Sequence, residues 1–176
     1  LCAIGLAIGF RANVWNIGAE GQFMLGAAAA TGVALYFDGS DSSLLLPVMI
    51  VAGALGGAAW AAIPALLRTR FNANEILVSL MLVYVAQLFV SWLVFGPWKD
   101  PDGFNFPQTR MFGDAALMPA LLEGTRLHYG FLLAIAVLSA GHAFMDRSFA
   151  GFRMRVAGAA PDAARYSGFS AARMIW

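Results

Sequence analysis

Long apolar runs separated by polar segments dominate the hydrophobic pattern of this chain. Residues 44–67 form the clearest run, without a single charged residue, and residues 76–95 form a second. A membrane-crossing helix needs about 20 predominantly apolar residues. Residues 129–145 form a shorter run that would cross with help from its flanks, and residues 1–37 form a run that is interrupted once. The pattern predicts an all-α, polytopic helical membrane protein with a discontinuous helix near its N-terminus.

The interruption lies at residues 13–22, where two asparagines, a glutamate, a glutamine and two glycines stand between apolar stretches. Because unpaired backbone N–H and C=O groups are costly in hydrocarbon, such a break persists in a membrane only where it is buried in protein or lines a wet cavity. Broken helices of this kind hold solute and ion sites in transporters. The break is therefore a candidate binding site.

The side chains of the break are suited to a polar solute. Asn16 and Gln22 carry both donors and acceptors, and an ionised Glu20 accepts, so the set matches hydroxyls or amides. The helix that begins near Glu20 also presents its positive end to a ligand. An equally simple interpretation is a cytoplasmic turn between two spans, with Arg11 as a positive anchor.

Two further features concern helix faces. Tyr84 and Gln87 lie three residues apart in the run at 76–95, so they share one face, which we expect to meet protein or water. Small residues spaced four apart allow helix backbones to approach closely in lipid. They occur at Gly5-xxx-Gly9, Gly26-xxx-Ala30 and Gly53-xxx-Gly57.

Composition supports a membrane location. Hydrophobic residues make up 60% of the 176 residues and charged residues only 12%, and the mean hydropathy is +0.71. So few charges cannot cover the surface of a soluble globule. A net charge of +1 gives no basic field for nucleic acid, and the single cysteine, Cys2, cannot form an internal disulfide. Because the sequence starts without Met and ends on an apolar run, we expect residues 1–176 to be a fragment of one larger membrane domain.

The arginines predict the topology. The segments 68–75 and 146–173 hold two and five arginines, whereas the turn at 38–43 holds none and the segment 96–128 is nearly neutral. Basic loops remain on the cytoplasmic side of a membrane. The segment 68–75 is therefore expected to be a cytoplasmic loop, in which Asn72 and Glu75 are spaced like a capping box for the next helix.

The segment 146–173 is expected to contain a short cytoplasmic helix. Pro161 at a first-turn position, Asp162 after it and Gly168 past the end bracket about two turns, over residues 161–167. Flanked by arginines, such a helix fits a groove of another protein, whose carboxylates would pair with the guanidinium groups. The alternative is a basic loop held at anionic lipid headgroups.

Four stretches together resemble a known family. They are Asn16-Ile-Gly-Ala-Glu-Gly-Gln22, Asn74-Glu-Ile-Leu-Val-Ser-Leu-Met-Leu-Val-Tyr84, Gly151-Phe-Arg-Met-Arg-Val-Ala-Gly158 and Ala163-Ala-Arg-Tyr-Ser-Gly168. In wording, order and spacing they resemble the permease subunits of bacterial ABC importers for nucleosides and simple sugars, which are related to ribose and branched-chain amino acid permeases.

The resemblance implies a multi-pass permease in the lipid bilayer of the bacterial inner membrane. It implies partnership with a second permease subunit, cytoplasmic ABC ATPase subunits that use the ATP, and an extracytoplasmic solute-binding protein. It places the substrate pathway at Asn16, Glu20, Gln22, Tyr84 and Gln87. It places the ATPase coupling segment at Gly151, Arg153, Arg155, Gly158, Ala163, Ala164, Arg165 and Gly168.

Two positions depart from the pattern of that family. Val83 stands where relatives usually have Asn, which removes a polar group from the helix. Ala160 stands where relatives often have Asn ahead of the proline, so the coupling helix lacks its side-chain N-cap, a contribution of typically ~1 kcal/mol.

Other functional classes leave weaker signals. An ion-coupled secondary transporter would use Glu20 as its proton or sodium site. An enzyme is disfavoured because His128, His142 and Cys2 form no catalytic or metal-binding motif, and because the only lysine, Lys99, is outside any phosphate-binding loop. The sequence identifies neither the solute nor whether the second permease is identical.

Overall fold

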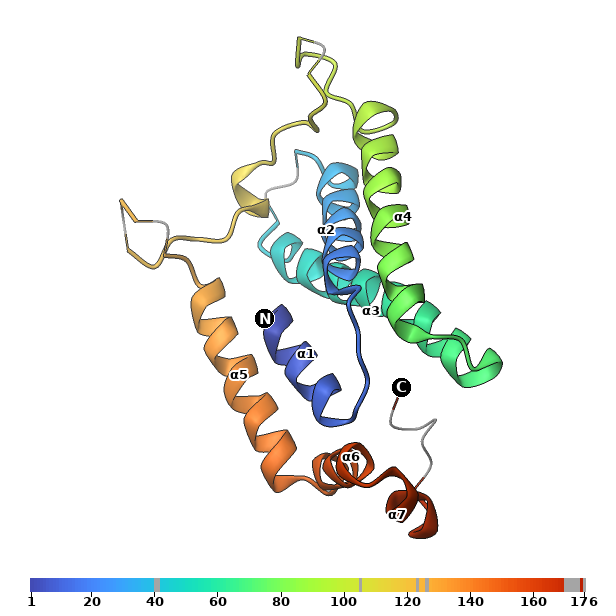
Figure 1. Ribbon diagram of the computed structural model, residues 1–176. Coiled ribbons are helices and arrows are strands. Elements are labelled where there is room, and N and C mark those ends of the chain that lie inside the picture. The colour runs from blue at the N-terminus through green and yellow to red at the C-terminus, as the bar shows by residue number, and fades with distance from the viewer. Residues whose placement is uncertain (40–41, 105, 123, 126, 170–174, 176) are drawn as a thin grey trace. The chain divides into compact units, whose positions relative to one another are not determined.

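The structure is a computed structural model that describes every residue except 40–41, 105, 123, 126, 170–174 and 176. The described part is helical apart from its loops and one isolated bridge between Ala120 and His128, which confirms the predicted all-α class. The described elements, labelled in Figure 1, are α1 (Cys2–Arg11), α2 (Ala19–Tyr36), α3 (Leu45–Phe71), α4 (Glu75–Phe95), the 3₁₀ turn η1 (Asp114–Ala116), α5 (Gly130–Arg147), α6 (Phe149–Ala159) and α7 (Pro161–Tyr166).

Three of the described helices, α3, α4 and α5, are long and apolar enough to cross a membrane. Helix α2 has 18 residues but is less apolar, since Glu20 and Gln22 lie near its start. Helix α1 has 10 residues and rises about 15 Å, roughly half the thickness of a hydrocarbon core. The predicted interruption therefore separates a short apolar helix from a longer one.

The chain forms two compact units, and each is described by itself. The first unit contains Leu1–Ala19, Ala62–Ser79 and Pro119–Trp176, and the second contains Glu20–Ala61 and Leu80–Met118. Helices α3 and α4 contribute residues to both.

Small residues bring α2 and α3 together in the second unit. A Cβ atom added to Gly26 would lie 2.8 Å from the carbonyl oxygen of Gly53, and one added to Gly53 would lie 3.5 Å from the Cβ of Ala30. Helix backbones approach this closely only where side chains are absent or small. The close-packing faces predicted at Gly26-xxx-Ala30 and Gly53-xxx-Gly57 are therefore confirmed, and they contact each other.

Helix α4 packs in the second unit through a stripe that includes Val83, Ala86 and Leu93, all buried. A Cβ atom added to Gly21 of α2 would lie 3.1 Å from the Cα of Val83. A separate small core holds η1 against the adjoining ends of α2 and α3, through Ala34, Leu45, Met49 and Ala116.

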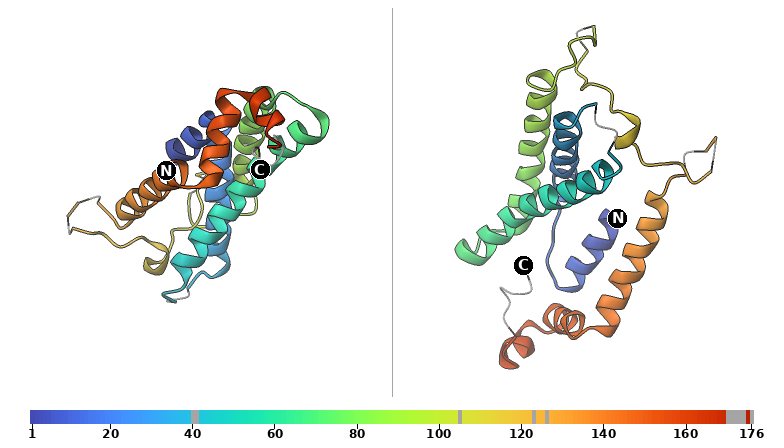
Figure 2. Two further views of the ribbon diagram at one scale, coloured as in Figure 1. Left: turned by 90° about the horizontal axis from the view of Figure 1, so that it is seen from below. Right: turned by 180° about the vertical axis from the view of Figure 1, so that it is seen from behind.

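In the first unit, α1 packs against α5 and α6, and α6 also packs against α5 and α7. The further views in Figure 2, like Figure 1, show α6 running past the C-terminal ends of α1 and α5. Gly141 supplies the small residue between α1 and α5, because its added Cβ would lie 3.1 Å from the Cγ2 of Ile4. No described atom outside its own helix backbone lies within 4 Å of a Cβ added to Gly5, so the close approach predicted at Gly5-xxx-Gly9 is not made at Gly5 among the described residues and stays a prediction.

The end of α3 differs from the prediction. The helix continues through the expected loop to Phe71. Arg68 and Arg70 lie in its last turn, where their positive charges interact favourably with the negative end of the helix dipole. Asn72 follows with a φ of 51°, the left-handed conformation that ends helices. It is therefore not the cap of α4. Asn74 fills that role, because its Oδ1 accepts a hydrogen bond of 3.0 Å from the backbone N–H of Ile76.

Candidate translocation and coupling site

The break after α1 is built by a defined helix ending. Asn13 has a φ of 57°, and the N–H groups of Asn13 and Val14 donate to the carbonyl oxygens of Phe10 and Gly9. These two bonds form a Schellman motif, which satisfies carbonyl groups at a helix end. The chain then runs without helical structure over residues 14–18 until α2 begins. The discontinuity thus has a fixed geometry at its start.

A buried serine of α4 holds the far end of the break. The Oγ of Ser79 accepts a 3.2 Å hydrogen bond from the N–H of Ile17 and donates to the carbonyl oxygen of Ile76. Ser79 is only 2% exposed. A Cβ atom added to Gly18 would lie 2.8 Å from the Ser79 carbonyl oxygen, so the break lies directly on the α4 backbone. Sequence reasoning missed this partner, because a lone serine in an apolar run does not signal its long-range contact.

The side chain of Asn16 uses only part of its hydrogen-bonding capacity within the break. Its Oδ1 accepts a 2.8 Å hydrogen bond from the N–H of Gly18, and its side chain is half-buried. This bond leaves the two amide N–H donors of Asn16 for another group. Nearby, the indole N–H of Trp15 donates to the Oδ1 of Asn13 at 3.0 Å, and the Trp15 ring lies 5.0 Å from that of Phe10.

The other predicted pathway residues lie in the second unit. Glu20 is exposed in the first turn of α2 and Gln22 is half-buried beside α3, where its carbonyl oxygen lies 3.1 Å from a Cβ added to Gly57. Tyr84 is 57% exposed and Gln87 is half-buried, so their shared face lies outside the buried stripe of α4. Asn16 belongs to the first unit and is described with it.

The segment after α5 contains a helix, α6, that the sequence did not suggest. Ser148 caps it by accepting a 2.9 Å hydrogen bond from the N–H of Gly151. A Cβ added to Gly151 would lie 2.5 Å from the carbonyl oxygens of Phe144 and Met145, at the end of α5. A Cβ added to Gly158 would overlap the carbonyl oxygen of Arg11, at the end of α1. Two of the predicted coupling residues therefore allow α6 to contact two helix ends directly.

Arg153 and Arg155 have partners within the chain. The guanidinium carbon of Arg153 lies 5.1 Å from the ring centroid of Phe169 and 5.8 Å from that of Phe149, within the range of cation–π attraction. The Nη1 of Arg155 lies 3.4 Å from the Oδ1 of Asp146, at the end of α5. These contacts tie α6 to α5 and to the residues after α7.

Helix α7 forms where Pro161 and Gly168 predicted it. Ala160 provides no side-chain cap, whereas the other end has a complete Schellman motif, with Gly168 at a φ of 78° and the Phe169 N–H bonded to the Ala164 carbonyl oxygen. Ala164 is only 2% exposed. The other residues around it are exposed, namely Asp162, Ala163, Arg165 and Tyr166. Ala164 therefore packs inward, and the remaining side chains of α7 are accessible.

Among the described residues, no three His, Cys, Asp or Glu side chains form a cluster that could hold a metal ion. The features that bear on the predicted site residues are the break, the two glycine contacts of α6 and the exposed face of α7.

Comparison with known proteins gives consistent matches along the whole chain. The family model described as "Branched-chain amino acid transport system / permease component" matches residues 1–176. The glucose ABC transporter permease protein TsgB13 of Haloferax volcanii is 39% identical over 97% of this chain and 47% of its own length. The guanosine permease NupP of Bacillus subtilis is 29% identical, and the nucleoside permease NupB of Lactococcus lactis is 26% identical, each over 99% of this chain and 50% of its own length.

The chain thus spans about half the length of the curated relatives it matches. No solved structure matches it.

Proposed function

Because the chain belongs to the branched-chain amino acid transport system permease family, we propose that it forms part of the membrane permease of an ATP-driven ABC importer. Proteins of this family are transport permeases rather than enzymes, and the three apolar helices are those of a membrane protein. The proposed location is the bacterial inner membrane, which the chain crosses several times. Its proposed partners are cytoplasmic ABC ATPase subunits, a second permease subunit and an extracytoplasmic solute-binding protein.

The observation that carries this proposal is the contact of α6 with α1. Gly158 lies against the Arg11 carbonyl oxygen, and Arg11 is the last residue of α1 before the break. A force applied to α6 and α7 by a moving ATPase would therefore reach the last residue of α1, next to the break, without an intervening side chain. Helix packing of this kind transmits displacement because packed groups are not compressible.

The proposed solute is a nucleoside or a simple sugar. The relatives are named for glucose, guanosine and nucleosides, all of which carry a hydroxylated sugar ring. The free amide donors of Asn16 and the side chains of Glu20 and Gln22 suit such hydroxyls. Tyr84 and Gln87 supply a second polar face within the proposed pathway.

The exposed face of α7 provides the test of ATPase coupling. In the full-length permease assembled with its ATPase, Ala163→Trp should abolish solute-stimulated ATP hydrolysis while leaving the permease folded, because Ala163 is exposed. Ala164→Trp is the matched comparison, and it should lower folded yield because Ala164 is buried. Normal stimulation in folded Ala163→Trp would count against the role of α7 as the coupling helix.

A further inference from the structure

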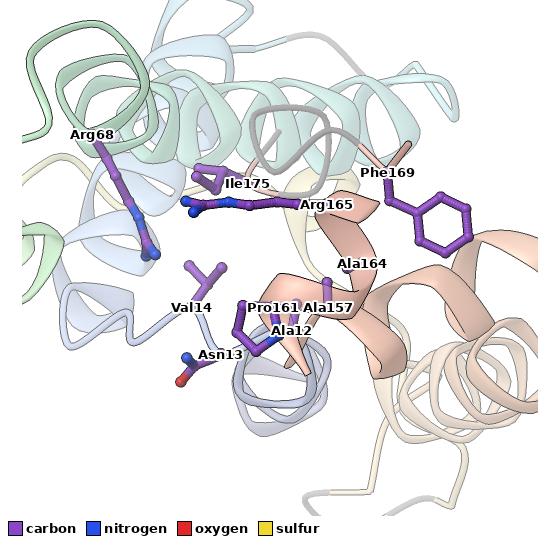
Figure 3. Close-up of a pocket in the computed structure, with 10 residues that line it drawn as sticks. All are labelled: Ala12, Asn13, Val14, Arg68, Ala157, Pro161, Ala164, Arg165, Phe169 and Ile175. Carbon is purple, nitrogen blue, oxygen red and sulfur yellow. The ribbon is translucent and has the colours of Figure 1, made fainter. Parts of the chain in front are cut away.

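A basic pocket in the first unit has no role in the proposed solute pathway, although one of its residues, Arg165, belongs to the predicted coupling segment. We call it the Arg68–Arg165 pocket, since it lies between the last turn of α3, the start of the break and helix α7, and has a volume of about 140 Å³. Figure 3 shows the side chains of Arg68 and Arg165 extending into the space beside Val14, with Asn13 at its edge. All of these residues belong to one compact unit.

The pocket presents more hydrogen-bond donors than acceptors. The carbonyl oxygen of Arg165 accepts from the Gly168 N–H, whereas its guanidinium group forms no hydrogen bond or ion pair with the described residues. Arg68 is paired with Glu75, but a guanidinium carries five N–H donors and one carboxylate does not occupy them all. The Oδ1 of Asn13 already accepts from Trp15, which leaves its amide N–H groups.

No carboxylate lines the pocket among the described residues. Two guanidinium groups that share a small space repel each other, and an anion between them would remove that repulsion while accepting bidentate hydrogen bonds. At roughly 30 Å³ for each water molecule, the volume holds several waters, which is also sufficient for a phosphate group. The chemistry of the pocket therefore matches a phosphate-class anion.

The position of the pocket indicates the source of that phosphate. It lies where α1 ends at Arg11 and α3 ends at Phe71, two apolar helices with arginines in their last turns, and arginines at the ends of apolar helices are typical of the cytoplasmic surface of a membrane. Part of its wall is apolar, through residues such as Val14 and Phe169. Basic pockets next to the cytoplasmic ends of membrane helices bind anionic lipid headgroups.

We propose that the Arg68–Arg165 pocket binds the headgroup phosphate of an anionic phospholipid. The proposal requires only that the helices lie in a membrane, and it does not depend on solute transport or on the identity of the ATPase. The lipid would join α3, the break and α7 at the membrane surface.

The test compares lipid retention in the full-length permease. The protein is reconstituted in nanodiscs of phosphatidylcholine with a titrated fraction of phosphatidylglycerol, and native mass spectrometry measures the bound lipid. Arg165→Gln should weaken phosphatidylglycerol binding about tenfold, the effect of losing one charge-assisted contact, and Arg165→Lys should restore part of it. Arg70→Gln is the matched control, because Arg70 lies in the same turn as Arg68 but outside the pocket.

Melting temperatures in pure phosphatidylcholine establish that each variant is folded. Equal weakening by Arg70→Gln and Arg165→Gln would indicate a diffuse surface charge and overturn the pocket. Stabilisation by inorganic phosphate without a preference for phosphatidylglycerol would assign a soluble anion and overturn the lipid. Unchanged lipid retention together with lost ATPase affinity in Arg165→Gln would assign the arginine to the protein partner instead.

Discussion

Gly158 has no room for any side chain, because its Cβ would overlap the Arg11 carbonyl oxygen. Gly158→Val should therefore displace α6 from α1. We expect lower thermal stability of the full-length permease and lost coupling of ATP hydrolysis to transport in the protein that still folds. Melting curves and a transport assay in proteoliposomes measure the two effects.

Gly5→Ala provides the control for that change, because no described atom lies within 4 Å of the added Cβ. It should be neutral or stabilising by up to about 1 kcal/mol, since alanine favours a helix over glycine. Equal stability of Gly158→Val and Gly5→Ala would contradict the contact between α6 and α1.

Ser79 is the second residue on which the break depends. Ser79→Ala removes the acceptor of the Ile17 N–H and leaves a partly buried donor unpaired, which costs about 1–3 kcal/mol. We expect a lower melting temperature and greater reactivity of cysteines introduced at residues 14–17. Ser91→Ala, an exposed position on the same helix, should change neither measurement. Similar reactivity in both variants would show that Ser79 does not hold the break.

At the scale of elements, the crossing of α2 and α3 is limited by backbone contact. Gly26→Leu would place a side chain against the Gly53 carbonyl oxygen, and overpacking of this kind costs typically about 1–3 kcal/mol. The expected result is a loss of folded protein, measured by size-exclusion yield after mild detergent extraction. Ala27→Leu points to the exposed side of α2 and should be tolerated. Normal yield of Gly26→Leu would disprove the close crossing.

The apolar runs and helix-ending residues made most elements predictable. Hydrophobic length indicated α3, α4 and α5, and the Pro161 and Gly168 pair bracketed α7, because these signals are local. Helix α6 was missed, since its arginines and glycines show no apolar periodicity and Ser148 is its main local signal. The extension of α3 to Phe71 was missed because Arg68 and Arg70 were interpreted as loop residues, although arginines are also favourable in the last turn of a helix.

The site was predictable only in part. Residue types in the break signalled polar chemistry, but Ser79 and the Gly158 contact join positions far apart in sequence, which no single-sequence pattern encodes. The arginines of α6 were expected to contact a partner protein, and this stays a prediction; within the chain Arg153 lies over aromatic rings and Arg155 pairs with Asp146. Composition does not distinguish an arginine that serves its own fold from one that serves another subunit.

At the scale of the molecule, the arginine distribution predicts which loops face the cytoplasm. With Cys2 replaced by serine, a cysteine at Asn72 should react with a membrane-impermeant reagent only in inverted vesicles, and one at Ser43 only in intact cells. Both positions are exposed at helix ends. Labelling of both cysteines from the same side would contradict α3 as a spanning helix.

The contact of α6 with α1 also constrains how the chain is made. Gly158 is synthesised 147 residues after Arg11 (158 − 11), so at about 5–20 residues per second the last turn of α1 remains without its α6 contact for on the order of ten seconds. During that interval a ten-residue apolar helix, too short to span a bilayer alone, has no α6 beside it. We therefore expect α1 to reach its final packing only after α6 has been synthesised, and nascent chains that stall before Ser148 should leave α1 open to proteases and insertion chaperones.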